Sequence, residues 1–320
     1  MSISYHGFQL TQGQLHVSIG ISPSHVCLAS LWREANKITV TALDKVTYQP
    51  PQLTNVLHEL AARWGFCTHP PCVLVMPTST YQLVRVEVPR DLNTAGISDL
   101  VTEQLQAKLT FDLSRVIFDF FEPPDYLNPD YSRWIYVVVT EKALIQNYTR
   151  PIVAAGFNLQ AVDIPEMALR NLLALSPIYS ENQGILWLDD YRSILILTHK
   201  QMICSIEFIA LGRQHLLQNM PEQIPTLIST LEQSIYQYMQ HFNLPRISQL
   251  MIAPVVDDLP TLPHCLSQAL HIPSQPLVLN QWVRTENLSF PLTSADYFLV
   301  LGAALREEDD AMDCACEEEA

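Results

Sequence analysis

Two adjacent carboxylates, Asp189 and Asp190, stand at a tight turn between the two apolar runs of GILWLDDYRSILILTHK (184–200). Paired acids at a turn can hold a hard cation such as Mg²⁺ through their oxygens. They can also serve general acid–base catalysis. Alternatively they only shape the turn, because an Asp side chain bonds readily to its own backbone. The sequence leaves these three interpretations open.

The other residue types that could carry chemistry lack catalytic or metal-binding spacing. None of the ten histidines stands in an HxxxH or HExxH arrangement, and Ser79 and Ser132 lack the GxSxG context of a hydrolase nucleophile. The seven cysteines are scattered, which is typical of a reducing compartment. We therefore predict no catalytic residue and no metal centre.

Two features could serve contact with a partner. The segment EPPDYLNPDYSRW (122–134) combines Tyr, Trp and Arg, which form hot spots when exposed, but it could equally be a rigid connector. Arg85 lies in the alternating run VRVEV, in the phase opposite Val84 and Val86, so we expect it to point away from the core. There it either keeps the surface soluble or pairs with an acidic group of a peptide.

Composition excludes several classes of protein. The 320 residues are 48% apolar and 16% charged, so the chain can bury a core, but no apolar run is long enough for a transmembrane helix. The net charge of −15 disfavours nucleic acid and direct contact with anionic membranes. Residues 307–319 hold eight acids and no base, which predicts a solvated, disordered end and leaves −7 elsewhere.

Glycine is scarce, with nine residues in the whole chain. Average usage of roughly 7% would give about 22. Phosphate-binding loops depend on glycine, because it lets backbone N–H groups approach the ligand closely. The low count disfavours a glycine-rich nucleotide site.

Hydrophobic periodicity predicts the same order of elements twice. Each half runs three strands and then alternates helix and strand, which is typical of a mixed-sheet α/β fold. A polar break at 176–183 is the expected boundary between the halves. The expected helices are 52–65, 93–111, 141–156, 165–175, 223–244, 259–270 and 294–306. The expected strands are 15–21, 25–32, 37–46, 72–76, 84–88, 116–121, 134–139, 159–163, 185–189, 193–198, 202–209, 247–253 and 276–280.

Two sequence blocks on these elements, YQLVRVEVP (81–89) and VDIPEMALRNL (162–172), are fairly specific. Weaker blocks follow in order through LEQSIYQYMQHF, ISQLMIAPV and YFLVLGAALR. Together they resemble the actin-like pilus-assembly proteins of the PilM type, and most of all those that build the mannose-sensitive haemagglutinin (MSHA) type IV pilus. The resemblance covers roughly residues 15–306.

This resemblance implies an α/β fold of the actin-like (RNase H-like) kind, with two lobes built on mixed sheets. Residues 1–180 would form the first lobe, with a small αβ subdomain inserted at about 78–160. Residues 181–306 would form the second lobe with a C-terminal helix, and 307–320 the acidic end. It also implies a cytoplasmic protein that reaches the inner membrane only through a PilN-like single-span partner and other platform proteins. The partner's N-terminal segment would dock between the inserted subdomain and the first lobe.

The resemblance also points to a cleft that binds nucleotide in actin-like ATPases, and this sequence departs from that pattern. In VSIGISPSHV, Gly20 remains, but Ser18 stands where the metal-serving Asp is expected. The second phosphate hairpin carries Asp189 and Asp190, and a carboxylate 4 Å from a phosphate costs about 4 kcal/mol at an effective dielectric constant of about 20.

Two further positions of that cleft are occupied by Ala253–Pro254 and Gly302. Ala253–Pro254 replaces an expected glycine pair where adenine approaches the backbone. Gly302 survives, although close helix packing would explain it equally well. We therefore expect a pseudo-ATPase whose degenerate cleft retains Gly20, Asp189, Asp190 and Gly302 and in which ATP and Mg²⁺ binding is disfavoured.

The sequence thus supports a non-enzymatic scaffold for pilus assembly. Two alternatives remain open: an ATP-binding switch whose lobes close on nucleotide, and the cytoplasmic module of a type II secretion platform.

Overall fold

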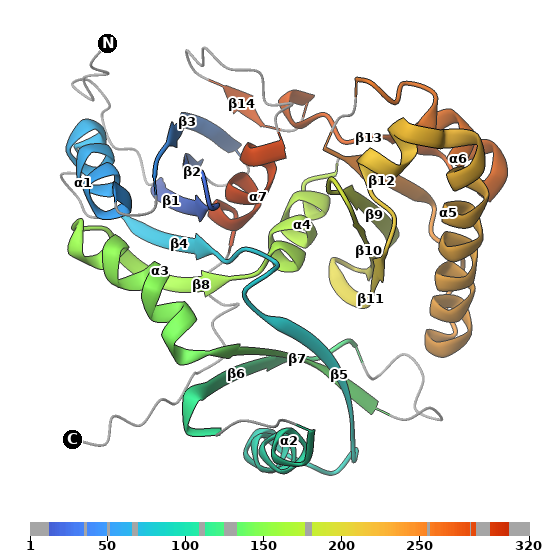
Figure 1. Cartoon of the computed structure of the whole chain (residues 1–320). Helices are drawn as coiled ribbons and strands as arrows, with labels where there is room; N and C mark the ends of the chain where they lie inside the picture. Colours follow the sequence, from blue (N-terminus) through green and yellow to red (C-terminus); the bar gives the residue numbers. More distant parts are fainter. Residues whose placement is uncertain are drawn as a thin grey trace.

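The fold is built on three β-sheets (Figure 1). The computed structural model describes residues 13–34, 37–49, 52–65, 70–108, 113–124, 133–176, 181–254, 257–281, 283–285 and 295–306. Ser132, most of the segment 122–134 and the acidic segment 307–320 lie outside the described residues. The predictions made for them therefore stay predictions.

The first sheet has the strand order β14-β3-β2-β1-β4-β8, and we call it the first lobe together with α1 (Leu53–Trp64) and α3 (Lys142–Ala154). Its strands are β1 (Gln14–Ile21), β2 (His25–Glu34), β3 (Lys37–Thr47), β4 (Pro71–Val75), β8 (Asn158–Asp163) and β14 (Arg284–Thr285). β1, β2 and β3 form an antiparallel meander, and β4 and β8 continue the sheet in parallel. Side chains alternate along β1, so Val17, Ile19 and Ile21 share a core with α1 and α3.

The second sheet repeats this order as β11-β10-β9-β12-β13, and we call it the second lobe. β9 (Asn182–Leu188), β10 (Ser193–His199) and β11 (Met202–Ile209) are antiparallel, and β12 (Gln249–Ala253) and β13 (Ser274–Pro276) are parallel to β9. α5 (Arg213–Phe242) and α6 (Leu262–Leu270) pack on this sheet (Figure 1). The duplicated topology predicted from the sequence is confirmed.

Two helices lie between these sheets, α4 (Pro165–Ala174) and α7 (Ala295–Ala304) (Figure 1). α4 follows the first sheet along the chain but packs on β9, β10 and β11. α7 follows the second sheet but packs on β1, β2 and β4, and the two helices contact each other. Each lobe therefore relies on a helix supplied by the other half of the sequence. The predicted boundaries near 180 and 306 adjoin segments outside the described residues and stay predictions.

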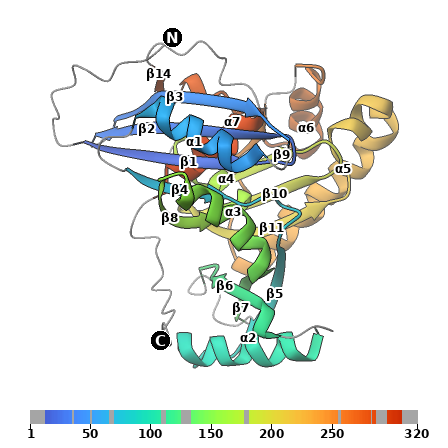
Figure 2. The ribbon, with the colours of Figure 1, turned by 60° about the vertical axis from the view of Figure 1, so that its left-hand side comes forward.

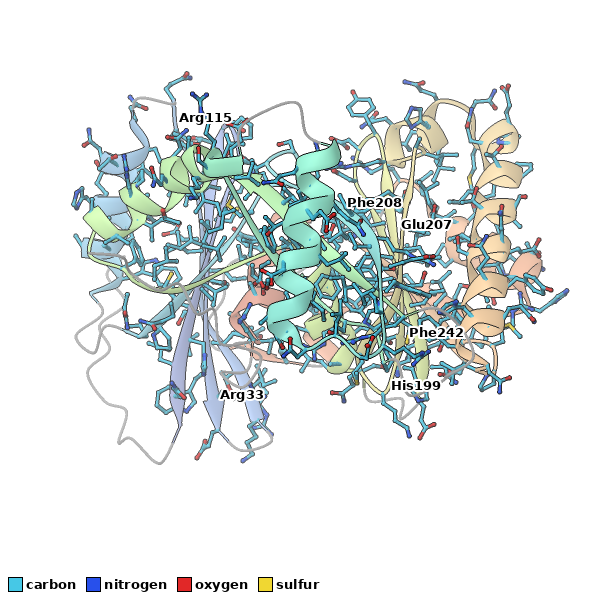
Figure 3. All side chains as sticks on the ribbon, turned by 90° about the horizontal axis from the view of Figure 1, so that it is seen from below. Arg33, Arg115, His199, Glu207, Phe208 and Phe242 are labelled. Carbon is cyan, nitrogen blue, oxygen red and sulfur yellow. The ribbon has the colours of Figure 1, made fainter. Side chains whose placement is uncertain are left out.

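A third, antiparallel sheet of order β5-β7-β6 is inserted after β4. It consists of β5 (Gln82–Val88), β6 (Val116–Phe121) and β7 (Arg133–Glu141), with α2 (Thr94–Lys108) covering one face. Val84, Val86 and Val88 share that face, as predicted. The view from below shows α2 in front, with Glu207, Phe208 and Phe242 of the second lobe to one side (Figure 3). We call these elements the inserted subdomain.

The helix α5 begins ten residues earlier than the periodicity predicts. Its N-terminal part contains Pro221, Pro225 and a non-helical residue, Asn219, which are unfavourable inside a helix and interrupt the helical pattern of the sequence. One apolar face of the helix is buried, with Leu227, Leu231, Ile235, Tyr238 and Phe242 facing the core. Within the described part of the chain, every helix is too short or too polar to cross a bilayer.

Candidate functional site

A buried carboxyl group lies where the two lobes and the inserted subdomain meet. Glu166 follows Pro165, the first residue of α4, and its side chain has no exposed surface. The hydroxyl of Tyr81 donates to its Oε2 over 2.6 Å. The second oxygen, Oε1, is buried without a hydrogen-bond partner. A carboxyl group in this state resists ionisation, because half of it faces no donor.

An arginine of the second lobe reaches the same place. Arg192 lies at the β9–β10 turn and donates from Nη2 to Oγ1 of Thr78, in the loop after β4. The same loop is fixed at Thr80, whose carbonyl oxygen accepts a 2.6 Å hydrogen bond from Oγ1 of Thr140 on β7. The Arg192–Thr78 contact therefore joins the second lobe to the loop that leads into the inserted subdomain.

The pKa of Glu166 reflects this environment. Burial raises it to about 7, and the hydrogen bond from Tyr81 and the charge of Arg192 oppose that rise only in part. Burial next to Glu166 also raises the pKa of the Tyr81 hydroxyl. Glu166 can therefore exchange a proton near neutral pH while it contacts a group of another element. This junction is the candidate functional site.

The first expected phosphate hairpin is packed rather than open. Ser18 is fully buried and its hydroxyl donates to the carbonyl oxygen of Val300 in α7. A Cβ atom on Gly20 would lie 2.8 Å from Cγ1 of the same valine. Small side chains at both positions let α7 approach β1. This packing explains Gly20 without a ligand, and its role in a nucleotide cleft stays a prediction.

The turn between β1 and β2 uses its own amide groups. The N–H of Ser22 donates to the carbonyl oxygen of His25 over 2.9 Å. The N–H groups of Ser24 and His25 donate to Oγ of Ser22 over 3.4 and 3.1 Å. Pro23 has no N–H. The donors that could face a phosphate at this turn are thus engaged inside it.

Asp189 and Asp190 form the second turn and cap α5. Their carbonyl oxygens accept hydrogen bonds from the N–H groups of Arg213 (2.9 Å) and Gln214 (2.8 Å). The side chain of Asp189 accepts the N–H of Asp190 over 2.8 Å, and that of Asp190 lies 3.6 Å from the guanidinium of Arg213. These contacts are those of a turn residue, and both side chains are about half exposed. A role of Asp189 and Asp190 in metal binding or catalysis stays a prediction.

Gly302, another of the expected cleft positions, also has a structural explanation. A Cβ atom on Gly302 would lie 2.1 Å from the carbonyl oxygen of Ala168, so the glycine permits α7 to cross α4. The bond between Ala253 and Pro254 at the end of β12 is cis. Among the described residues, no group of three His, Cys, Asp or Glu side chains is placed to hold a metal ion.

Arg85 is exposed on β5, as predicted, and its guanidinium carbon lies 3.6 Å from the ring centroid of Trp134. Trp134 in turn lies 3.7 Å from the ring of His241 in α5. Arg85 therefore lies at the contact between the inserted subdomain and the second lobe. Its pairing with a peptide acid stays a prediction.

Sequence reasoning missed the junction around Glu166. The residue looks like an ordinary acid in the first turn of a helix, where negative charge is favourable. Its burial depends on Tyr81 and on the β9–β10 turn, both distant in sequence. The block VDIPEMALRNL, which contains Glu166, carried the family resemblance but did not indicate that the residue is buried.

The comparisons with known proteins bear on the fold. No protein-family model and no curated protein sequence matches the chain. A solved PilM–PilN type IV pilus biogenesis complex is similar with a TM-score of 0.68 and 14% identity, over 91% of this chain and 97% of that one. The chain has an actin-like fold.

Two further solved structures match less well. The cytoplasmic domain of EpsL, an inner-membrane component of the type II secretion system of Vibrio cholerae, has a TM-score of 0.49 at 14% identity and covers 91% of this chain and 95% of its own. A Bacteroides thetaiotaomicron protein with an actin-like ATPase fold and unknown function also has a TM-score of 0.49. It is 10% identical, over 90% of this chain and 95% of that one. The predicted two-lobed α/β fold is confirmed by the sheets of this structure and by the likeness to the PilM–PilN complex.

Proposed function

We propose that this chain is a PilM-like scaffold of a type IV pilus assembly platform. It would act in the cytoplasm by docking the N-terminal segment of a PilN-like single-span protein, which ties it to the inner membrane and to other platform proteins. The observation that supports this most strongly is the shared fold with the PilM–PilN complex over nearly the whole of both chains.

The strand edges of the structure suit an extended peptide. β8 ends the first sheet, and β5 and β6 end the sheet of the inserted subdomain. An edge strand offers backbone donors and acceptors to an added strand. Since Trp134 and Tyr136 on the subdomain sheet pack on the second lobe, we place the partner on the side that faces β8 and α3.

We propose that the scaffold works without ATP turnover. The amides of the β1–β2 turn are engaged internally, Ser18 is bonded to α7, and the second hairpin presents carboxylates. A triphosphate would have to break these contacts and meet negative charge. The protein would then be a pseudo-ATPase that keeps the lobed architecture for docking.

We further propose that the pilus is of the MSHA kind and that the chain is MshI-like. This refinement rests on the blocks YQLVRVEVP and VDIPEMALRNL. Immobilised N-terminal peptides of PilN-like proteins from MSHA, other type IV pilus and type II secretion systems test it. We expect the MSHA peptide to retain the folded chain best, and preferential retention by a secretion-system peptide would contradict the refinement.

A further inference from the structure

A cationic cluster lies between the inserted subdomain and α5. Arg85 stacks on Trp134, and the ring of His241 packs on the same tryptophan. Burial and the charges of Arg85 and Arg90 lower the pKa of His241 to about 4. Two positive charges therefore act on one imidazole, in a protein whose net charge is −15.

The cluster also contains a donor without an acceptor. Trp134 is 5% exposed, and its Nε1–H is buried without a hydrogen-bond partner. A buried donor is stabilised by any acceptor that reaches it. Arginine and indole N–H groups together favour an oxyanion, which accepts several hydrogen bonds at once.

We propose that Arg85, Arg90, Trp134 and His241 form a carboxylate-binding site whose occupant is the acidic segment 307–319 of this same chain. The site differs from the proposed partner groove, because it lies on the second-lobe side of the inserted subdomain. It is also independent of the proposed pilus function, since it requires only this chain.

The acidic segment starts close enough to reach the cluster. It follows Arg306, which lies 3.6 Å from Asp163, three residues before Glu166. Glu166 contacts Tyr81, and Arg85 is four residues further along β5, a rise of about 13 Å. Thirteen extended residues span up to about 45 Å.

The carboxylate of Glu87 lies beside the proposed site and disfavours binding of a second carboxylate there. Glu87 is exposed two residues after Arg85, on the same face of β5, and it pairs in register with Trp134. Its charge repels an incoming carboxylate. We therefore expect Glu87→Gln to strengthen occupation, a change that a purely structural cluster would not show.

The test uses the full chain and the His241 ring as a reporter in NMR titrations. One sample is wild type, and in the other the eight acids of 307–319 are replaced by their amides. A bound carboxylate favours the imidazolium, so we expect the pKa of His241 to be about one unit higher in wild type. The difference should shrink in 1 M salt.

Variants of the cluster supply the controls. Arg85→Gln should remove the dependence on the acidic segment, whereas Arg150→Gln, on exposed Arg150 of α3, should leave it intact. If Arg85→Gln does not fold, Arg90→Gln serves as the alternative variant, because it keeps the stacking of Arg85 on Trp134. Equal His241 pKa values in wild type and the amide variant overturn the proposal. If added inorganic phosphate raises the pKa of His241 in both samples, the site binds free anions, and the proposal is also overturned.

Discussion

At the scale of single residues, a carboxyl group with a raised pKa lies at the junction of the two lobes. Glu166 is buried and accepts a hydrogen bond from Tyr81 on one carboxyl oxygen. The positive charge of Arg192 lowers the pKa of Glu166 in part. Its pKa of about 7 is far above that of an exposed glutamate. Folding therefore binds a proton to it in the neutral range.

We expect Glu166→Gln to change how stability depends on pH. Folding raises the pKa of Glu166. Its protonated side chain therefore contributes to the free energy of unfolding of the wild type fully below about pH 4.5, and this contribution is lost as pH rises through 7. The amide cannot titrate, so the stability of E166Q relative to wild type should rise by up to about 3 kcal/mol between pH 4.5 and 8. Thermal or urea unfolding across that range measures it.

Tyr81→Phe is the matched control, because it removes the donor but leaves the carboxyl. It should raise the pKa of Glu166 further and cost about 1–3 kcal/mol at pH 8. A constant offset between E166Q and wild type at every pH would contradict the account of Glu166.

At the scale of elements, the central helices α4 and α7 decide the architecture. They cross where Gly302 meets the carbonyl oxygen of Ala168, and the Nδ2 of Asn171 donates to the carbonyl oxygen of Gly302 over 3.0 Å. Ser18 and Gly20 provide the matching close contact between α7 and β1. Small residues at these points hold both lobes together.

We expect Gly302→Ala to destabilise the protein by about 3 kcal/mol or more. The new Cβ would meet backbone of Ala168, which cannot move without separating the helices. Gly96→Ala in α2 is the matched control, since its Cβ would meet side-chain atoms of Leu92 and Asn93 and no backbone, and alanine favours a helix by up to about 1 kcal/mol. Chemical denaturation compares them, and equal midpoints would contradict the packing explanation of Gly302.

The docking of the inserted subdomain on the second lobe gives another prediction. The hydroxyl oxygen of Tyr136 accepts the N–H of Ile206, on the edge strand β11, over 3.0 Å. Tyr136→Phe leaves that buried amide unbonded and should cost about 1–3 kcal/mol. Hydrogen exchange at Ile206 should accelerate in Y136F, and unchanged exchange would show that the contact does not form.

The sequence predicted the helices and strands better than it predicted which of them pack together. Val84, Val86 and Val88 give the buried face of β5, and the stripe from Leu227 to Phe242 gives that of α5, because local periodicity records which face is apolar. Periodicity does not record which sheet a helix covers, so the exchanged positions of α4 and α7 were not foreseen. The same limit hid the junction around Glu166, which is assembled from distant turns.

At the scale of the whole molecule, two similar lobes enclose two central helices, and the inserted subdomain stands below them against the second lobe (Figures 1 and 2). The Arg192–Thr78 contact ties the second lobe to the loop that leads into the subdomain. Docking a partner on such a body requires no chemical step. Under the scaffold proposal, nucleotide would have to break the hydrogen bonds inside the β1–β2 turn and meet the carboxylates of Asp189 and Asp190.

We therefore expect millimolar MgATP to leave the melting temperature unchanged. Binding at 100 times the dissociation constant would add about 2.7 kcal/mol to the free energy of unfolding, an easily measured shift. Wild type with Mg²⁺ alone is the control. A shift that requires both ATP and Mg²⁺ would favour the ATP-binding switch instead.

The most direct test of the scaffold proposal is calorimetric titration of the full chain with the N-terminal peptide of a PilN-like protein. The account predicts saturable one-to-one binding whose affinity is the same with and without MgATP. Absence of binding by folded protein, or binding only when MgATP is present, would contradict it.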